Sequence, residues 1–230
     1  MPTDNDSCAE LLSLAVHELR TPASVVSGYL RMLQRDDDTP LSERQRKMVN
    51  EAEKSCARLV ALVAEMSEVS KLDGGITPLR QEPLDVFTAV QEVAEGVHEA
   101  EDRAVRFEVR GQASGASVKG DSARLRSAFN AIFKAILREQ PSACTVVADR
   151  RIASRDGTIS AVVVVARLDT VQAAYEASPA AFDEKRGGLG LALPIARRVI
   201  EGHGGRLWAP ATSAERGAAI VSLPLSESNR

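Results

Sequence analysis

Aromatic residues are scarce in this sequence, where tryptophan, tyrosine and phenylalanine together make up 3% of the chain. The total hydrophobic content is nevertheless 44%, so any core must be built mainly from alanine, valine, leucine and isoleucine. The net charge of -3 gives no bulk attraction for nucleic acid. A length of 230 residues suits one or two small domains. The composition therefore predicts ordinary globular domains without a nucleic-acid partner.

Cysteine is equally rare. The three residues, Cys8, Cys56 and Cys144, are scattered and odd in number. They predict no disulfide framework and no metal site, and they are typical of a reducing cytoplasm. No run approaches the ~18 apolar residues of a membrane-spanning helix, and no signal peptide opens the chain. We therefore expect a cytoplasmic protein without membrane insertion.

Only three histidines are present, and one of them begins the most informative stretch. His17 is followed at once by the carboxylate of Glu18 and, one helical turn later, by the hydroxyl of Thr21. A neutral imidazole is nucleophilic near physiological pH. A neighbouring carboxylate can bind the other ring nitrogen or accept a proton. The pattern predicts a nucleophilic site at His17, and a surface histidine that merely precedes an acidic residue is the alternative.

The six residues from His17 to Pro22 resemble the H-box of sensor histidine kinases, the sensors of two-component systems. In that family the histidine attacks the γ-phosphate of ATP, and the phosphoryl group then passes to an aspartate on a response regulator. The resemblance implies that His17 is the phosphoacceptor and Glu18 its acid/base partner. It also implies that Thr21 orients water for phosphatase activity and that a response regulator receiver domain is a partner.

Two long helices are predicted in the first part of the chain. Apolar residues recur at helical spacing from Cys8 to Gln34, and a second helix is expected from Leu41 to Leu72, with Ser42 as a candidate cap. Asp36–Pro40 separates the two helices, which predicts an antiparallel hairpin. His17 and Thr21 fall off the apolar stripe, toward solvent.

The second helix also carries a heptad-like seam. Its members are Met48, Ala52, Leu59, Leu62, Met66 and Val69. Two hairpins related by a two-fold axis can bury such a seam in a four-helix bundle, so we expect a homodimer. Residues 8–73 would then resemble the dimerisation and histidine phosphotransfer domain of the same family. The alternative is a monomeric hairpin that packs its stripe on the second domain.

Asp73-Gly74-Gly75 marks a domain boundary, and residues 76–226 alternate between strand and helix patterns. The strands are expected at 76–84, 105–110, 144–152, 159–168, 206–210 and 218–225, and the helices at 85–102, 121–138 and 190–202. This order predicts an α/β sandwich with helices on one face of a mixed sheet. The whole fold class is thus a helical hairpin followed by an α/β domain, which resembles the ATP-binding catalytic domain of histidine kinases.

Part of the nucleotide machinery is present in the sequence. The stretch from Gly187 to Ala192 resembles the glycine-rich G2 box, whose backbone N–H groups meet phosphate oxygens. Gly188 and Gly190 are therefore the candidate cofactor-binding glycines. Phe182 occupies a place where the family often has an aromatic residue of the ATP lid, and His203 is expected to be a turn and packing residue.

The metal-binding box departs from the family pattern. The stretch from Asp121 to Leu125 resembles the start of the N-box, but the two asparagine positions fall on Ala131 and Ala135. A methyl group cannot replace the oxygen ligand that Mg²⁺ requires. Asn130 lies about 100° away around the helix and should not substitute. Arg138 stands where a lysine is frequent.

The adenine box is altered as well. Asp169 is the candidate for the adenine-binding aspartate, but Val171 and Ala173 replace both glycines of the family's Asp-x-Gly-x-Gly. In an alternative register Arg167 takes the aspartate's place, and arginine has no acceptor for an amino group. The sequence therefore predicts a degenerate pocket with no certain cofactor, which would use ATP and Mg²⁺ only if it still works.

Three functions remain open from the sequence. The first is a phosphotransferase and phosphatase that carries phosphate on His17 with weak or no ATP binding. The second is an ATP-dependent autokinase with a divergent pocket. The third is a non-catalytic protein that binds a response regulator.

Overall fold

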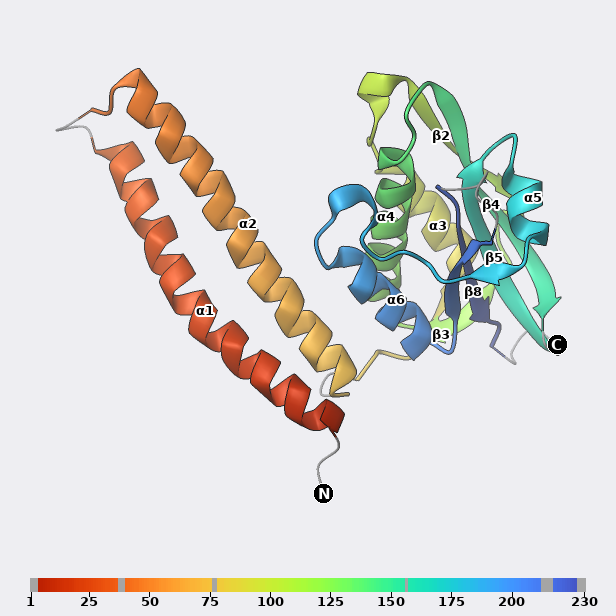
Figure 1. Cartoon of the computed structure of the whole chain (residues 1–230). Helices are drawn as coiled ribbons and strands as arrows, with labels where there is room; N and C mark the ends of the chain where they lie inside the picture. Colours follow the sequence, from red (N-terminus) through yellow and green to blue (C-terminus); the bar gives the residue numbers. More distant parts are fainter. Residues whose placement is uncertain (1–3, 37–39, 76–77, 156, 212–216, 227–230) are drawn as a thin grey trace. The chain divides into compact units, whose positions relative to one another are not determined.

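The computed structural model describes residues 4–36, 40–75, 78–155, 157–211 and 217–226. The chain divides into two compact units, Met1–Thr77 and Pro78–Arg230. The first unit is helical, and the second combines helices with a sheet (Figure 1). A helical hairpin followed by an α/β domain was expected, and this fold class is confirmed.

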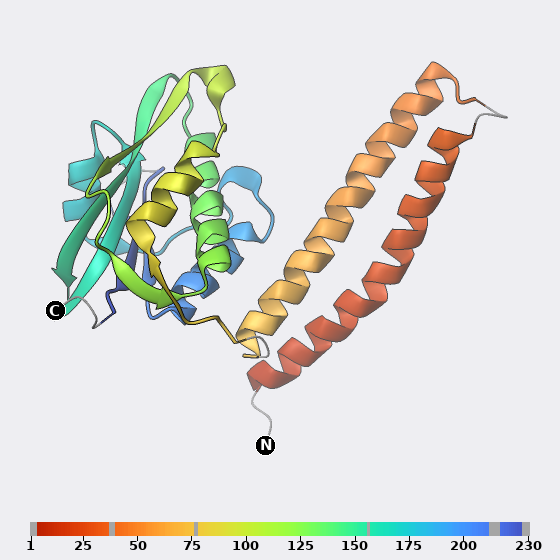
Figure 2. The same cartoon turned by 180° about the vertical axis from the view of Figure 1, so that it is seen from behind.

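The first unit is an antiparallel pair of long helices, α1 (Asp4–Arg35) and α2 (Glu43–Asp73), which Figures 1 and 2 show from opposite sides. Helix α1 continues through Pro22 without a break. At the start of α2, the Ser42 hydroxyl accepts a hydrogen bond from the Gln45 N–H, and the Gln45 side chain accepts one from the Ser42 N–H. This capping box fixes the beginning of the helix as the sequence predicted.

The row of side chains that the hairpin buries differs from the predicted seam. Cys56, Val63 and Ser70 are buried on α2 at intervals of seven residues. Met48 and Leu59 of the predicted seam are 63% and 57% exposed. The predicted seam is thus not the row that packs within one chain, and its burial between two chains stays a prediction.

The hairpin consequently presents many large apolar side chains to its surroundings. They are Leu14, Leu19, Val25, Val26, Tyr29, Met32, Leu33, Met48 and Leu59. None of the helices in the described part of the chain combines the length and apolar character that a membrane crossing requires.

The second unit contains a mixed sheet of six strands. The elements in chain order are β1 (Glu82–Asp85), α3 (Val86–Glu95), η1 (Glu101–Arg103), β2 (Val105–Gly111), β3 (Ser117–Gly120), α4 (Ser122–Arg138), β4 (Cys144–Arg155), β5 (Thr158–Arg167), α5 (Val171–Glu176), β6 (Pro179–Ala180), η2 (Arg186–Gly188), α6 (Ala192–Gly202), β7 (Arg206–Pro210) and β8 (Ala219–Pro224). The strand order is β2-β4-β5-β8-β7-β6, and β1 pairs separately with β3. Strand β2 is parallel to β4, and the other pairs are antiparallel.

The helices lie on both faces of this sheet. Helices α3, α4 and α6 cover one face, and the short α5 lies on the opposite face (Figures 1 and 2). Phe129 and Phe133 of α4 are fully buried, and Phe133 contacts Phe107 of β2 at a centroid distance of 4.9 Å. Three of the five phenylalanines, Phe107, Phe129 and Phe133, thus lie together between α4 and the sheet.

Several predicted elements are shorter than expected. The strand expected at 76–84 is limited to β1, and its first two residues lie outside the described residues. The helix expected at 85–102 ends at Glu95, and the Gly96 N–H that follows donates to the Val93 carbonyl. Helix α5, β3 and β6 were not predicted, and α6 begins at Ala192 instead of Gly190.

Candidate functional site

His17 lies on the outer surface of α1 with a side chain that is 77% exposed. Its Nδ1 atom is 3.4 Å from Oε1 of Glu18, a distance longer than a typical hydrogen bond. The contact uses Nδ1, so Nε2 is the ring nitrogen left to react. The predicted exposure of the histidine is confirmed, and a bulky phosphorylated partner can reach it.

Glu18 and Thr21 complete the group predicted from the sequence. The Glu18 side chain is 73% exposed, and Thr21 is exposed one turn further along α1. A carboxylate beside the imidazole stabilises positive charge on the ring as the other nitrogen reacts. The Thr21 hydroxyl can hold a water molecule near the same ring. The helix therefore places an imidazole, a carboxylate and a hydroxyl on neighbouring exposed positions.

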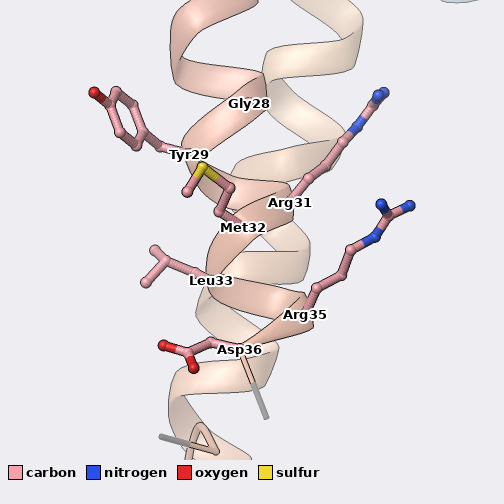
Figure 3. A pocket seen from close by; sticks show the side chains of 7 residues that line it. All are labelled: Gly28, Tyr29, Arg31, Met32, Leu33, Arg35 and Asp36. Carbon is pink, nitrogen blue, oxygen red and sulfur yellow. The ribbon is translucent and has the colours of Figure 1, made fainter. Parts of the chain in front are cut away.

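A recess of about 630 Å³ lies further along the outer surface of α1. It is lined by Gly28, Tyr29, Arg31, Met32, Leu33, Arg35 and Asp36 (Figure 3). Gly28 follows His17 by eleven residues, about three helical turns, so both lie on one face of α1. A Cβ atom at Gly28 would meet nothing within 4 Å. The glycine is therefore not required by packing inside the hairpin.

The side chains around this recess combine apolar and basic character. Tyr29 and Met32 are 64% and 67% exposed, and the two arginines, Arg31 and Arg35, extend from the other side of the helix (Figure 3). Arg31 also lies 3.6 Å from Glu53 of α2. Neither Tyr29 nor Arg35 was identified from the sequence, because exposed residues carry no periodic signal.

A second, apolar groove of about 490 Å³ lies between the two helices. It is lined by Leu19, Pro22, Ala23, Val26, Leu30, Ala52, Ser55, Cys56, Leu59 and Val63. Leu19 and Val26 are about half exposed within it, although both are apolar. An exposed apolar groove of this kind is typical of an interface.

The residues of the predicted adenine box lie in an unexpected arrangement. Asp169 accepts hydrogen bonds of 3.0 and 2.6 Å from Arg167, and its side chain is 60% exposed. Helix α5 begins at Val171, and Ala174 is buried against β5 and β8 on the back face of the sheet. The two positions that lack the expected glycines, Val171 and Ala173, therefore lie in a short helix that packs on the sheet through Ala174.

The positions of the missing metal ligands are closed. Ala135 is fully buried and Ala131 is 8% exposed. Gly187, with φ of +64°, lies directly on α4, and a Cβ atom on Gly187 would be 2.9 Å from Cα of Ala135. Gly187 thus packs directly against α4 at Ala135, one of the two positions where the sequence lacks the expected asparagine.

The glycine-rich loop offers few donors to an anion. Gly188 and Gly190 are exposed and have φ of +60° and +64°. At the start of α6, the Ala192 N–H already donates to the Leu189 carbonyl at 3.3 Å, and Pro194 has no N–H. Two of the first three backbone positions of α6 are therefore lost to phosphate binding.

His203 is a packing residue, as expected. Its Nε2 accepts a hydrogen bond of 2.9 Å from the backbone N–H of Asp121, and its Nδ1 donates to the Val199 carbonyl at 2.6 Å. These two bonds tie the start of α4 to the end of α6. Phe182 is 5% exposed and lies under the Arg186 guanidinium, 5.2 Å from its ring centroid.

Comparison with known proteins identifies the first unit most directly. The family described as His Kinase A (phospho-acceptor) domain matches residues 9–75. Sensor protein GacS of Pseudomonas syringae pv. syringae is 28% identical over 233 residues, which cover 94% of this chain and 25% of GacS. The histidine-protein kinase BarA of Escherichia coli K12 is 25% identical and covers 86% of this chain and 22% of its own length. The chain therefore spans about a quarter of these relatives.

Solved structures share the fold of the whole chain. Full-length ShkA, solved in complex with AMPPNP, has a TM-score of 0.69 at 22% identity and covers 94% of this chain and 46% of its own. The histidine kinase ThkA, solved in complex with the response regulator protein TrrA, has a TM-score of 0.55 at 18% identity, with coverages of 96% and 63%. Residues 9–75 thus match the phospho-acceptor domain of histidine kinases, and the whole chain shares the fold of solved histidine kinases.

Proposed function

We propose that His17 accepts a phosphoryl group from a phosphorylated partner and transfers it to an aspartate of a response regulator receiver domain, without using ATP. The observation that carries this proposal is the contrast between the two units. The H-box side chains are exposed and free to react, whereas the positions matched to adenine and metal binding are engaged or covered by the protein itself.

The chemistry needs no cofactor. Nε2 of neutral His17 attacks the phosphorus of an aspartyl phosphate, the P–N bond forms, and the P–O bond to the aspartate breaks. The aspartate leaves as a carboxylate, and the positive charge on the ring is stabilised by Glu18 next to Nδ1. The reverse step delivers the group to a second receiver domain. In the phosphatase reaction, Thr21 would position the water that attacks the aspartyl phosphate.

The same surface supplies a docking site for the receiver domain. The recess floored by Gly28 lies on the face of α1 that carries His17, and Tyr29 and Met32 provide exposed apolar contacts beside it. Arg31 and Arg35 add positive charge for an acidic partner. ThkA, whose fold this chain shares, was solved with a response regulator protein bound.

Each unit has its own role, and the first unit also binds a second copy of the chain. Residues 8–73 form the dimerisation and phosphotransfer domain, because the half-exposed apolar groove of the hairpin fits a second hairpin. Residues 76–226 form a degenerate catalytic domain, in which Asp169, Gly188 and Gly190 mark a former nucleotide site. The free thiols of Cys56 and Cys144 fit a cytoplasmic setting.

The test uses receiver domains charged with labelled phosphate by acetyl phosphate, mixed with the full chain in the absence of nucleotide. We expect acid-labile, base-stable label on the wild type and none on His17→Ala. His98→Ala is the matched control, because His98 is also exposed and lies 3.0 Å from a carboxylate, that of Glu101.

Two outcomes contradict the proposal in different ways. Label that arrives on the isolated chain from Mg-ATP supports the autokinase instead. The second outcome has two parts: no tested receiver domain labels the wild type, and His17→Ala still binds the receiver. That outcome supports a non-catalytic binding protein.

A further inference from the structure

Residues 78–81, termed the connector here, join the boundary between the two units to β1. These described residues belong to the second unit and form neither helix nor strand. Figures 1 and 2 show this stretch passing beside the end of α6. Its attachment to the second unit therefore depends on individual side-chain and backbone contacts.

The first contact is apolar. The half-buried Leu79 lies on Gly202, the last residue of α6, and a Cβ atom on Gly202 would be 2.7 Å from Cδ1 of Leu79. Carbon atoms that are not bonded pack at about 3.5–4.0 Å, so the leucine fits there because residue 202 is a glycine. The connector is thus seated on the end of α6.

The second contact is polar and reaches the start of α4. The Arg80 N–H donates to Oδ2 of Asp121 in a long hydrogen bond of 3.5 Å, while Oδ1 accepts from the Arg124 N–H at 3.1 Å. Asp121 is 8% exposed, so its carboxylate is largely removed from water. One oxygen therefore caps α4, and the other holds the connector.

His203 joins these two attachment points. It follows Gly202 directly, its Nε2 accepts from the Asp121 N–H at 2.9 Å, and its Nδ1 donates to the Val199 carbonyl at 2.6 Å. A backbone N–H only donates and a carbonyl only accepts, so this arrangement needs a neutral ring with its hydrogen on Nδ1. Gly120 packs against the same ring, because a Cβ atom on Gly120 would be 2.7 Å from Cδ2 of His203.

Several charged residues adjoin this ring or its partners. They are Asp121 and Arg124 of α4, Arg80 of the connector, Lys119 of β3, and Arg198 and Glu201 of α6. The Arg198 guanidinium donates to the Pro194 carbonyl, and Glu201 accepts from Arg197. Lys119 is exposed on the face of β3 opposite the buried Gly120. Asp121, whose own N–H meets Nε2, is thus the anion that a positive ring would attract.

A proton on Nε2 of His203 would undo the arrangement in two ways. The new N–H would face the Asp121 N–H, so the bond between the ends of α4 and α6 is lost. The positive ring would also attract the Asp121 carboxylate and compete with the Arg80 N–H for Oδ2. Histidine commonly gains a proton between about pH 8 and pH 5, so mild acid should loosen the connector.

We propose that residues 78–81 form a pH-operated latch, which neutral His203 holds on the joint between α4 and α6 and which opens when this histidine is protonated. Opening adds the four residues of the connector to the chain that links the two units, which is about 14 Å of reach at about 3.5 Å per residue. The latch thus sets the length of the tether between the units. This inference does not rest on phosphotransfer by His17.

The readout is trypsin cleavage of the full chain after Arg80, measured by mass spectrometry at pH 8 and pH 6. The rate is divided by that of a free peptide with the sequence of residues 76–84, which removes the effect of pH on the protease. This ratio follows the open population of the connector. In the wild type we expect the ratio to rise about tenfold from pH 8 to pH 6. Circular dichroism at both pH values checks that the chain remains folded.

His203→Gln and His98→Gln are the matched variants for the pH response. Glutamine does not titrate, so His203→Gln should give the same ratio at pH 8 and pH 6. His98 is exposed and lies beside Glu101, away from the connector, so His98→Gln should respond as the wild type does. Equal ratios at the two pH values in the wild type overturn the proposal, and so does a pH response that survives in His203→Gln.

A pair of glycine variants keeps the test valid if His203→Gln does not fold. Gly202→Ala places a methyl group where Leu79 lies, so the ratio at pH 8 should rise severalfold. Gly96 also stands at a helix end, and a Cβ atom there would meet the Val93 carbonyl oxygen at an ordinary 3.6 Å. Gly96→Ala should therefore keep the wild-type ratio. Equal ratios in Gly202→Ala and Gly96→Ala overturn the seat of the connector on α6 and the latch with it.

Discussion

Arg167 binds both carboxylate oxygens of Asp169, at 3.0 Å through Nε and 2.6 Å through Nη2. The hydrogen bond to Asp169 raises the pKa of the Arg167 guanidinium. The two residues that the sequence offered for the adenine-binding position, Asp169 and Arg167, are therefore bonded to each other. Both oxygens of the candidate adenine-binding carboxylate are therefore already bonded to a neighbour at the end of β5.

We expect Mg-ATP not to bind the wild type at millimolar concentration. Restoring the family residues at Ala135, Val171 and Ala173 should not rescue binding. Val171→Gly and Ala173→Gly each cost about 1 kcal/mol in α5, and Ala135→Asn introduces an amide where Gly187 leaves no room. Calorimetry should show no binding by either protein, and the triple variant should unfold at a lower temperature. Micromolar binding by the wild type would contradict the degenerate pocket.

Much of this fold follows from local signals in the sequence. The capping box at Ser42 and the N-cap Asp121, whose carboxylate accepts from the Arg124 N–H, mark the starts of α2 and α4 within one or two residues. Strand β7 has the predicted bounds, Arg206–Pro210. These elements combine strong periodicity with a residue that physically ends or begins them.

The remainder depends on contacts between distant residues. Residues 171–176 form a helix because Ala174 packs against the back of the sheet, and no local pattern announces that contact. The same holds for the loop before α6, whose place on α4 depends on the contact between Gly187 and Ala135. The exposure of His17 was predicted from the helical stripe, whereas the recess around Gly28 required three-dimensional structure.

The apolar groove of the hairpin should make the protein a dimer. Leu59 lines this groove, and Leu62 follows it by three residues, about one helical turn along α2. Replacing both with glutamate would bury unpaired charge at a cost of several kcal/mol. Light scattering should therefore show a dimeric wild type and a monomeric double variant. Lys54→Glu, at a largely exposed position, is the control and should remain dimeric. A monomeric wild type at micromolar concentration would contradict the bundle.

Thr21→Ala should separate the two activities of the H-box. The hydroxyl is placed to orient water and takes no part in the P–N bond, so transfer to the receiver should persist at close to the wild-type rate. Dephosphorylation of the receiver should fall about tenfold or more, in the range of a single positioning group. Both rates can be followed by the decay of labelled receiver phosphate. Equal loss of the two activities would indicate a structural role for Thr21.

Asp121 should make the free energy of unfolding of the second unit depend on pH in the acidic range. Burial alone would raise the pKa of this carboxyl, but hydrogen bonds from the Arg124 and Arg80 N–H groups and the nearby arginine charges lower it. A lowered pKa in the folded state means that the stabilisation is present above the unfolded value of about 3.9 and is lost as pH falls through the folded value.

Urea unfolding at neutral and acidic pH tests this effect. At neutral pH, Asp121→Ala should lose about 1 kcal/mol as the helix cap is removed. Asp121→Asn keeps a capping oxygen and should lose less at neutral pH, and its stability should decline less steeply than that of the wild type below about pH 4. Parallel declines in the wild type and Asp121→Asn would exclude this carboxylate as the source.

Gly28 should show opposite effects on stability and on partner binding. Glycine inside an exposed helix is less stable than alanine by about 0.5–1 kcal/mol, and a Cβ atom at this position meets nothing within 4 Å. Gly28→Ala should therefore raise the unfolding temperature of the hairpin. Gly28→Leu places a large side chain in the recess beside Tyr29 and Arg31, so it should weaken receiver binding about tenfold or more.

Ser127→Leu is the control for this pair, because Ser127 is exposed on α4 of the second unit and does not line the recess. It should leave receiver binding close to that of the wild type. Binding can be measured by calorimetry with the receiver domain that exchanges phosphate with His17. If Gly28→Leu binds as well as the wild type, the receiver does not approach this face of α1, and the docking surface must lie elsewhere on the hairpin. A loss of binding in Gly28→Leu alone, with the hairpin more stable in Gly28→Ala, identifies the glycine as a residue kept for close approach of the partner.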